Sequence, residues 1–345
     1  MNLAIEIGAI TPDNLKRTVE WVQQAERLGV STAFSAEAWW SDAVTPLAYL
    51  ADKTERITLA TGILQTTART PAMTAMTALT LHDLTGGRFA LGLGASGPQV
   101  VEGLHGMAYD AAYTRLKETV DICRMIFAGE EIRYDGKVFR LPRPGGEGRA
   151  LRVAHAPTRV PIYLATLAPR ALRLTGAVAD GWLGTSFSPD HPEAHLPFLR
   201  EGAERAGRPM SNLDLCVSVR VEIGDDVERI IAGRKKTVAF NLGGMGSATT
   251  NFYNDAFRRA GFEEDARAIQ SLWIAGRRDE AARRVPNALV TEFQAVGTRE
   301  MVRERLRRYR DAGVTTLKLG LDSAKLGAPR VELLEEVVDL MEEPR

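Results

Sequence analysis

The sequence predicts an α/β fold, a parallel (β/α)₈ TIM barrel made by a single domain over residues 1–345. Short apolar segments alternate with amphipathic helical segments about eight times along the chain. Several of the apolar segments, such as Phe89–Leu93, carry almost no polar residue, as expected of parallel strands covered on both faces. This number of strand–helix cycles favours a closed barrel over a doubly wound open sheet, which remains the alternative.

In the first half of the chain, residues typical of helix starts and helix ends mark the bounds of the predicted elements. Thr11-Pro12 and Thr70-Pro71 each place a capping hydroxyl before a proline, which favours a helix start. Gly29 and Gly86-Gly87 are typical helix stops. The strands expected here are Leu3–Ile7, Thr32–Ser35, Ile57–Leu64 and Phe89–Leu93. The helices that follow them are expected over 12–28, Pro46–Lys53, 71–85 and a segment that starts at Asp110 or Thr114 and runs through Ile126.

In the second half of the chain the alternation of strands and helices continues, and two longer segments interrupt it. Residues 130–160 are rich in Pro, Gly and Arg and contain a hairpin signal at Asp135-Gly136. Residues 243–290 start with a glycine-rich turn and add helices over Asn254–Gly276 and Asp279–Arg284. We interpret both as insertions in the barrel. The remaining strands are Pro161–Ala165, Gly181–Leu183, Leu213–Ile223 and Val314–Leu319, with helices over Pro169–Val178, Pro192–Ala206, Val227–Phe240, Thr298–Ala312 and Val331–Met341.

The amino-acid composition limits the classes of binding partner that we expect. Lys plus Arg and Asp plus Glu both number 44, so the formal charge of zero gives no reason to expect nucleic acid or an anionic membrane. No run approaches the roughly 18 apolar residues of a membrane helix, and the first ten residues resemble a strand more than a signal peptide. The two cysteines, Cys123 and Cys216, show no metal or disulfide spacing and fit a reducing cytoplasm.

A glycine-rich loop follows the fourth strand. Gly92, Gly94 and Gly97 match the G-x-G-x-x-G pattern, but a dinucleotide fingerprint belongs in the first βα turn with a helix directly behind it. Three units precede this one, so we reject a Rossmann site. The small residues Ala95, Ser96 and Gly97 nevertheless allow backbone N–H groups to approach an anion. A tight turn without a ligand is the alternative.

A second anion site is predicted after the fifth strand. Ala165, Thr166 and Leu167 run directly into the helix that starts at Pro169. Free backbone donors and the helix dipole at such a junction suit a phosphate group. An ordinary helix cap without a ligand explains the same residues equally well.

One carboxylate lies beside two indoles after the second strand. Glu37 is followed by Trp39 and Trp40, and Trp182 and Phe187 are candidates for an opposite wall. Because barrel active sites lie at the carboxyl ends of the strands, this set predicts a substrate pocket. A desolvated Glu37 would hold a proton more readily and could serve as a catalytic acid or base. Simple packing under a loop is the alternative.

The five histidines predict no metal site. His191 and His195 have i,i+4 spacing but no third ligand, which favours a surface pair at a Pro-rich helix start. His105 lies in a strand-end loop and has no assignable role. No nucleophile elbow or Ser-His-Asp order supports acyl transfer.

At these residues the chain resembles the luciferase-like monooxygenase superfamily, in particular its oxidoreductases that use the deazaflavin coenzyme F420. The resemblance covers nearly the whole chain and includes a fairly specific stretch after the fourth strand. The matching segments are Thr61-Gly62-Ile63-Leu64, Leu84–Phe89, Leu91–Gly103, Pro161–Ala165, Ala179-Asp180-Gly181-Trp182 and Ala312–Thr316.

The resemblance implies a cofactor site. In this family the tricyclic ring lies against a bulge after the third strand, often with a non-prolyl cis peptide, which maps to Gly62-Ile63 beside Thr61. It implies that the cofactor phosphate lies near the two predicted anion sites and near Gly181. It also implies a small-molecule substrate and a homodimer.

The sequence differs from the family pattern at one position that bears on the type of reaction. In alcohol-oxidising relatives an acid at the end of the second strand is followed by a histidine, whereas Ala38 follows Glu37 here. We therefore expect a reductase that transfers hydride from the deazaflavin C5 to an activated double bond. An FMN-dependent two-component monooxygenase and a non-catalytic deazaflavin-binding protein remain the alternatives.

Overall fold

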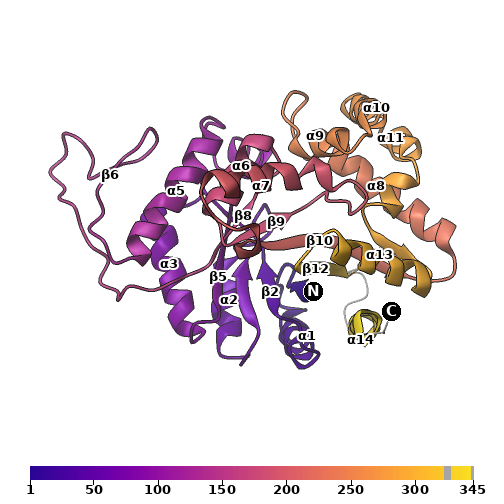
Figure 1. Ribbon diagram of the computed structural model, residues 1–345, viewed down its shortest axis with the longest axis horizontal. Coiled ribbons are helices and arrows are strands. Elements are labelled where there is room, and N and C mark those ends of the chain that lie inside the picture. The colour runs from indigo at the N-terminus through magenta and orange to yellow at the C-terminus, as the bar shows by residue number, and fades with distance from the viewer. Residues whose placement is uncertain (322–327, 343–345) are drawn as a thin grey trace.

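The computed structural model describes residues 1–321 and 328–342, and these form a closed parallel barrel with flanking helices (Figure 1). The strands follow one another around the barrel in chain order, and the last pairs with the first. The barrel strands are β1 (Asn2–Glu6), β2 (Thr32–Ser35), β3 (Thr58–Thr61), β5 (Phe89–Gly94), β8 (Ile162–Ala165), β9 (Gly181–Gly184), β10 (Asp214–Ile223) and β12 (Thr316–Leu321). The expected (β/α)₈ fold is confirmed.

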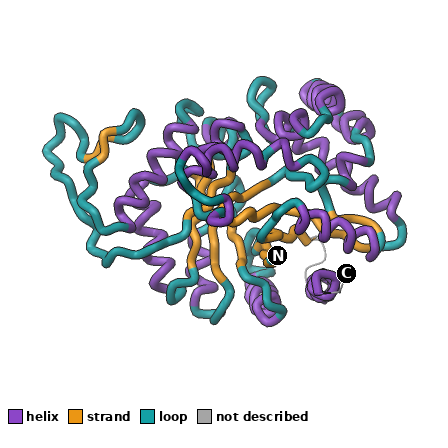
Figure 2. The backbone as a smooth tube through the Cα atoms, in the orientation of Figure 1, coloured by secondary structure: helices purple, strands orange, loops and turns teal. Residues whose placement is uncertain are grey.

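Helices surround the strands on the outside of the barrel (Figure 2). The Thr70 hydroxyl accepts from Met73 N at 3.3 Å, and Thr298 caps its helix in the same way, which satisfies N–H groups that the first helical turn leaves free. The helices of the barrel layer are α1 (Leu15–Arg27), α2 (Val44–Ala51), α3 (Pro71–Leu84), α4 (Pro98–Val101), α5 (Ala112–Phe127), α6 (Pro169–Val178), α7 (Leu196–Arg205), α13 (Arg299–Asp311) and α14 (Ala328–Glu342).

The observed strands differ from the predicted ones in two details. The single strand expected over Ile57–Leu64 is divided into β3 and β4 (Leu64–Gln65), because Gly62 and Ile63 bulge out of the ladder between them. β11 (Ala295–Gly297), which pairs with β10, was not predicted, since three residues are too few to show a strand period.

Both insertions are present. The first carries a hairpin of β6 (Tyr134–Asp135) and β7 (Arg140–Leu141), in the segment that projects away from the barrel in Figure 1. The second follows α8 (Val227–Gly243), and its helices bury their own apolar core beside the barrel. Its long expected helix is two helices, because Gly261 turns the chain at φ +91°. They are α9 (Phe252–Arg259) and α10 (Glu263–Ile274), followed by α11 (Arg278–Arg284) and α12 (Ala288–Thr291).

The interior of the barrel is filled by small and apolar side chains. Its inner cluster consists of Ala4, Phe34, Ala60, Ala90, Leu183 and Cys216. A packed interior leaves the carboxyl ends of the strands as the place for a site. Among the described residues, no helix is long and apolar enough to cross a membrane.

Candidate active site at the barrel mouth

The loops after β3, β5 and β8 lie side by side at one end of the barrel. β5 pairs with β3 and β4 on one side and with β8 on the other. In this register Leu64 aligns with Leu93, and Gly94 aligns with Ala165. The three loops that the sequence analysis singled out therefore leave neighbouring strands at the same end, the carboxyl end of the barrel.

The peptide bond between Gly62 and Ile63 is cis, as the family resemblance implied. The backbone around it is bonded to the end of β2, since Gly62 N donates to Ser35 O at 2.7 Å and Glu37 N donates to Ile63 O at 3.3 Å. A Cβ on Gly62 would lie 2.8 Å from Phe34 Cδ1. Only glycine fits there without displacing the Phe34 ring.

Two glycines of β5 leave the space beside the bulge free of side chains. A Cβ on Gly92 would lie 1.9 Å from Thr61 O, and a Cβ on Gly94 would lie 2.6 Å from Ile63 Cδ1. Side chains at these positions would push the bulge out of place. The bulge and β5 thus form a shallow surface with few side-chain atoms, which suits a flat ring system.

The loops after β5 and β8 present unpaired backbone donors. Among the described residues, the N–H groups of Ser96, Gly97, Thr166 and Leu167 have no hydrogen-bond partner. Ser96 adopts the left-handed conformation at φ 60°, which turns this loop sharply. Helix α6 starts directly after the second set. Converging N–H groups at a helix start bind anions, so the loops fit the phosphate of a cofactor.

Two residues of the expected cofactor set serve another purpose. Thr61 is fully buried, and its hydroxyl exchanges hydrogen bonds with the backbone N–H and carbonyl of Gly92. It fixes β3 to β5 beneath the bulge. Gly181 starts β9 on the amino-terminal side, and a Cβ there would lie 2.1 Å from the Tyr163 ring. The Tyr163 ring fills that space, so Gly181 contributes to packing and not to the cradle.

Glu37 is held by a cation that the sequence did not reveal. Arg69 Nη1 donates to both carboxylate oxygens, at 2.6 and 2.8 Å, and Gln65 N donates to Oε1 at 2.8 Å. Glu37 is 9% exposed. Because both oxygens accept charged or backbone donors, Glu37 connects the second-strand loop to the bulge and is not a free acid or base.

The aromatic side chains divide into two groups. Trp39 and Trp40 are 56% and 52% exposed and pack edge to face at 5.2 Å, beside the Glu37 loop. Trp182 and Phe187 are fully buried, and the Trp182 indole N–H donates to Thr166 O at 2.9 Å. The expected opposite wall is therefore wrong for this pair, which supports the β8 loop from within the core.

His195 lies in that same buried region. Its ring packs against Trp182 and Phe187, and neither ring nitrogen has a partner among the described residues. Burial, with a smaller contribution from the charge of Arg259, lowers the pKa of His195 to about 3. His191 pairs with Glu292 at 2.9 Å, and the described residues contain no cluster suited to a metal. The expected surface pair is wrong for His195, which is fully buried because its ring packs under Trp182 and Phe187.

The second insertion reaches the mouth of the barrel. Gln99 Nε2 donates to Gly246 O, and Arg259 donates to Leu167 O at 2.7 Å. Tyr253 of α9 hydrogen-bonds Thr185 at the end of β9, and burial raises the pKa of its hydroxyl. No sequence pattern predicts these contacts, because they join residues far apart in the chain.

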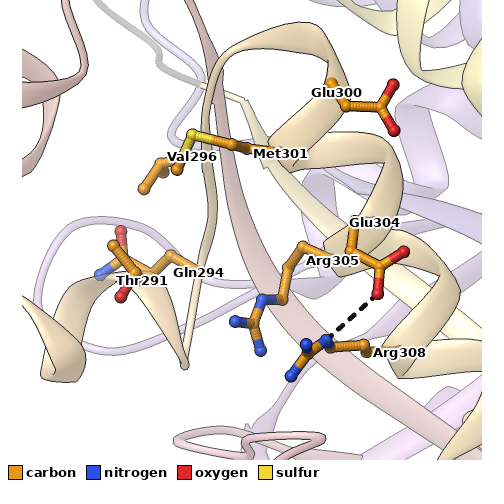
Figure 3. A pocket seen from close by; sticks show the side chains of 8 residues that line it. All are labelled: Thr291, Gln294, Val296, Glu300, Met301, Glu304, Arg305 and Arg308. Atoms are coloured by element: carbon orange, nitrogen blue, oxygen red, sulfur yellow. Dashed lines mark hydrogen bonds and ion pairs between the residues drawn. The ribbon is translucent and has the colours of Figure 1, made fainter.

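A separate surface pocket of about 390 Å³ lies beside α12 and α13 (Figure 3). None of its residues belongs to the loops after β3, β5 and β8. Its charged groups are already paired, since Arg308 bonds Glu304 and Asp190, and Arg305 also bonds Asp190. It is lined by Thr291, Gln294, Val296, Glu300, Met301, Glu304, Arg305 and Arg308. We place the reaction site at the barrel mouth.

Comparisons with known proteins agree with this fold. A Mycobacterium tuberculosis protein named as a coenzyme F420-dependent oxidoreductase is 38% identical over 334 residues, 94% of this chain and 96% of that protein. A 5,10-methylenetetrahydromethanopterin reductase of Archaeoglobus fulgidus is 27% identical over 279 residues, 79% and 80% of the two chains. The solved coenzyme F420-dependent tetrahydromethanopterin reductase from Methanopyrus kandleri superposes with a TM-score of 0.79 at 22% identity, covering 98% and 97%.

The family model described as luciferase-like monooxygenase matches residues 3–316, most of the chain. Its span includes the cis peptide, both anion-binding loops and the strands that carry them. This chain belongs to the luciferase-like monooxygenase family.

Proposed function

We propose that this protein is a coenzyme F420-dependent oxidoreductase that transfers hydride between the deazaflavin C5 and a small organic substrate, acting as a reductase. The observation that carries the proposal is the single cradle built by the loops after β3, β5 and β8. It combines a glycine-lined bulge with four unpaired backbone donors. The F420-dependent relatives support the choice of cofactor.

The residues present fit such a cofactor. Gly62 and Ile63 offer a flat surface for the ring, because the neighbouring glycines keep side chains away from it. Ser96 and Gly97, together with Thr166 and Leu167, offer N–H groups for the phosphate. The bound coenzyme supplies the hydride, and the protein orients it and excludes water.

The loop after the second strand supports the proposed direction of hydride transfer. Ala38 has no atom that accepts a proton, and both oxygens of Glu37 already accept donors from Arg69 and Gln65. The loop after β2 therefore holds no free base for alcohol oxidation. Hydride delivery to an electron-poor double bond needs no base there, and the proton that completes the reduction would come from water. Trp39 and Trp40 would cover the substrate side of the ring.

A fluorescence titration tests the cofactor assignment. The purified protein is titrated with F420 and, separately, with FMN. Saturable F420 binding with much weaker FMN binding is the expected result. Preferential FMN binding would support the monooxygenase alternative. Tight F420 binding without oxidation of reduced F420 by any member of a panel of activated alkenes, imines and ketones would support a non-catalytic binding protein.

We also propose that the protein is a homodimer in the cytoplasm. An apolar face on α2 and α3 is exposed, with Tyr49, Met73, Met76 and Leu84 between 44% and 55% accessible. Faces of this kind mark association sites. Cys123 and Cys216 are buried free thiols, which fits a reducing compartment. Light scattering of the wild type and of M73E/M76E tests the dimer: a monomeric wild type would refute it.

A further inference from the structure

Three charged side chains line the inside of the barrel mouth on the side away from the anion cradle. Glu6 ends β1, Lys318 lies in β12, and Arg220 lies in the last third of β10. Strand alternation places them on the inner face, because Ala4 and Cys216 of the same strands belong to the inner cluster. The neighbouring strands connect them to the bulge: Glu6 is in register with Phe34, and Phe34 packs against Gly62.

The charges in this group do not cancel. Lys318 is almost buried and pairs with Glu6 at 3.1 Å, with its ammonium 5.5 Å from the centre of the Phe34 ring. Arg220 approaches Glu6 only to 3.9 Å and has no hydrogen bond within the part of the chain that the structure describes. The buried Arg330 also lies close, because it donates to the backbone carbonyl of Glu6 at 3.1 Å. The positive charges therefore outnumber the one carboxylate, and Arg220 is the cation of this group that is exposed to solvent.

The Arg220 side chain is also accessible to solvent at the barrel mouth. Its side chain is 47% exposed although it starts inside the barrel, and that of Glu6 is 38% exposed. Arg220 crosses over Gly320 of β12, where a Cβ would lie 2.6 Å from Arg220 Cδ. A guanidinium that solvent can reach, and that is held only by a long ion pair, can bind an anionic group at the barrel mouth.

We propose that Arg220 binds a carboxylate of the substrate, so that the protein reduces small organic monoanions. The proposal rests on the proposed function. Among these cations Arg220 is the exposed one, and Glu6 beside it would repel a second negative charge, which favours a carboxylate over a dianionic phosphate. Guanidinium and carboxylate also share a planar, two-pronged geometry. Arg220 would then fix the position of the reducible bond relative to the ring.

Binding of two isosteric probes tests the proposal. The F420-loaded protein is titrated with sodium crotonate and with crotonamide at constant ionic strength, with deazaflavin fluorescence as the readout. Crotonate should bind at least tenfold more tightly than crotonamide. R220M should weaken crotonate binding at least tenfold, R220K should restore part of it, and R229M on the surface of α8 should change nothing. F420 affinity should be the same in all variants.

Three results of the titrations with crotonate, crotonamide and F420 would overturn the proposal. They are equal binding of crotonate and crotonamide, unchanged crotonate binding in R220M, and loss of F420 affinity in R220M, which would place Arg220 against the cofactor. Inorganic phosphate binding more tightly than crotonate would also contradict a monoanion site. Calorimetry of crotonate with the F420-free protein separates this inference from the cofactor assignment, because it needs no deazaflavin.

Discussion

Arg69 Nη1 lies 2.6 Å from Oε1 and 2.8 Å from Oε2 of Glu37, so one guanidinium nitrogen bridges both oxygens of the carboxylate. The same carboxylate accepts the backbone N–H of Gln65, two residues after the cis peptide. Glu37 therefore joins the loop after β2, the bulge after β3 and the start of α3. We assign it to positioning of the bulge.

The variant E37Q tests this assignment. It removes the negative charge while Arg69 remains only 20% exposed, so the free energy of unfolding should fall by about 2 kcal/mol. F420 should bind more weakly, because the Gln65 backbone loses its charged acceptor. Chemical denaturation and F420 titration measure the two effects, with D52N at an exposed surface pair as the control. Wild-type stability and affinity in E37Q would remove Glu37 from this role.

G94A tests the shape of the cradle floor. The new Cβ would lie 2.6 Å from Ile63 Cδ1, and the Ile63 side chain has to move into the space proposed for the ring. F420 affinity should fall at least tenfold, with a cost in stability of about 1–3 kcal/mol. G148A, where a Cβ meets nothing within 4 Å, should match the wild type. Unchanged F420 affinity in G94A would argue against a ring on the bulge.

His195 makes stability depend on pH. Its folded-state pKa of about 3 lies below the ordinary value of 6.5, so below pH 6.5 the unfolded chain binds a proton that the folded protein does not. The free energy of unfolding should therefore fall by about 1.4 kcal/mol per pH unit from pH 6.5 down toward pH 3 from this group alone. Urea denaturation at several pH values isolates it as the difference between wild type and H195L.

H105L is the matched control for this series, because His105 is exposed. It should keep the pH dependence of the wild type. An H195L variant with the same slope as the wild type would show that His195 titrates normally in the folded protein.

Both thiols should be inert in the folded protein. Burial raises the pKa of Cys123 to about 12 and raises that of Cys216 as well, so neither forms a thiolate near neutral pH. A colorimetric thiol reagent should detect no fast-reacting group in buffer and both groups in guanidinium chloride. Rapid labelling of the native protein would indicate that the inner barrel opens on the timescale of the reaction.

The fold could be predicted because each strand carries its own local signals. Thr32–Ser35 and Pro169–Val178 have the predicted bounds, set by apolar runs and by Pro or Gly at the ends. The bulge at Gly62-Ile63 could be placed only through the family resemblance, since a cis bond leaves no periodic pattern. Arg69 and Arg220 were missed because their significance depends on neighbours that are distant in the chain.

The errors at the site have the same origin. Trp182 lies within β9 and Phe187 just after it, near a strand end where sequence rules favour a pocket wall, yet packing around His195 buries both side chains. Gly181 belongs to a matching family segment, but its position beside the Tyr163 ring gives it a packing role. Sequence patterns show which residues end a strand and do not show which way the following loop turns.

A crystal structure of the protein with F420 bound tests the central claim most directly. The account predicts that the deazaflavin ring lies against Gly62 and Ile63 and that the phosphate accepts from the N–H groups of Ser96, Gly97, Thr166 and Leu167. A ring bound elsewhere, or a phosphate away from both loops, would contradict it.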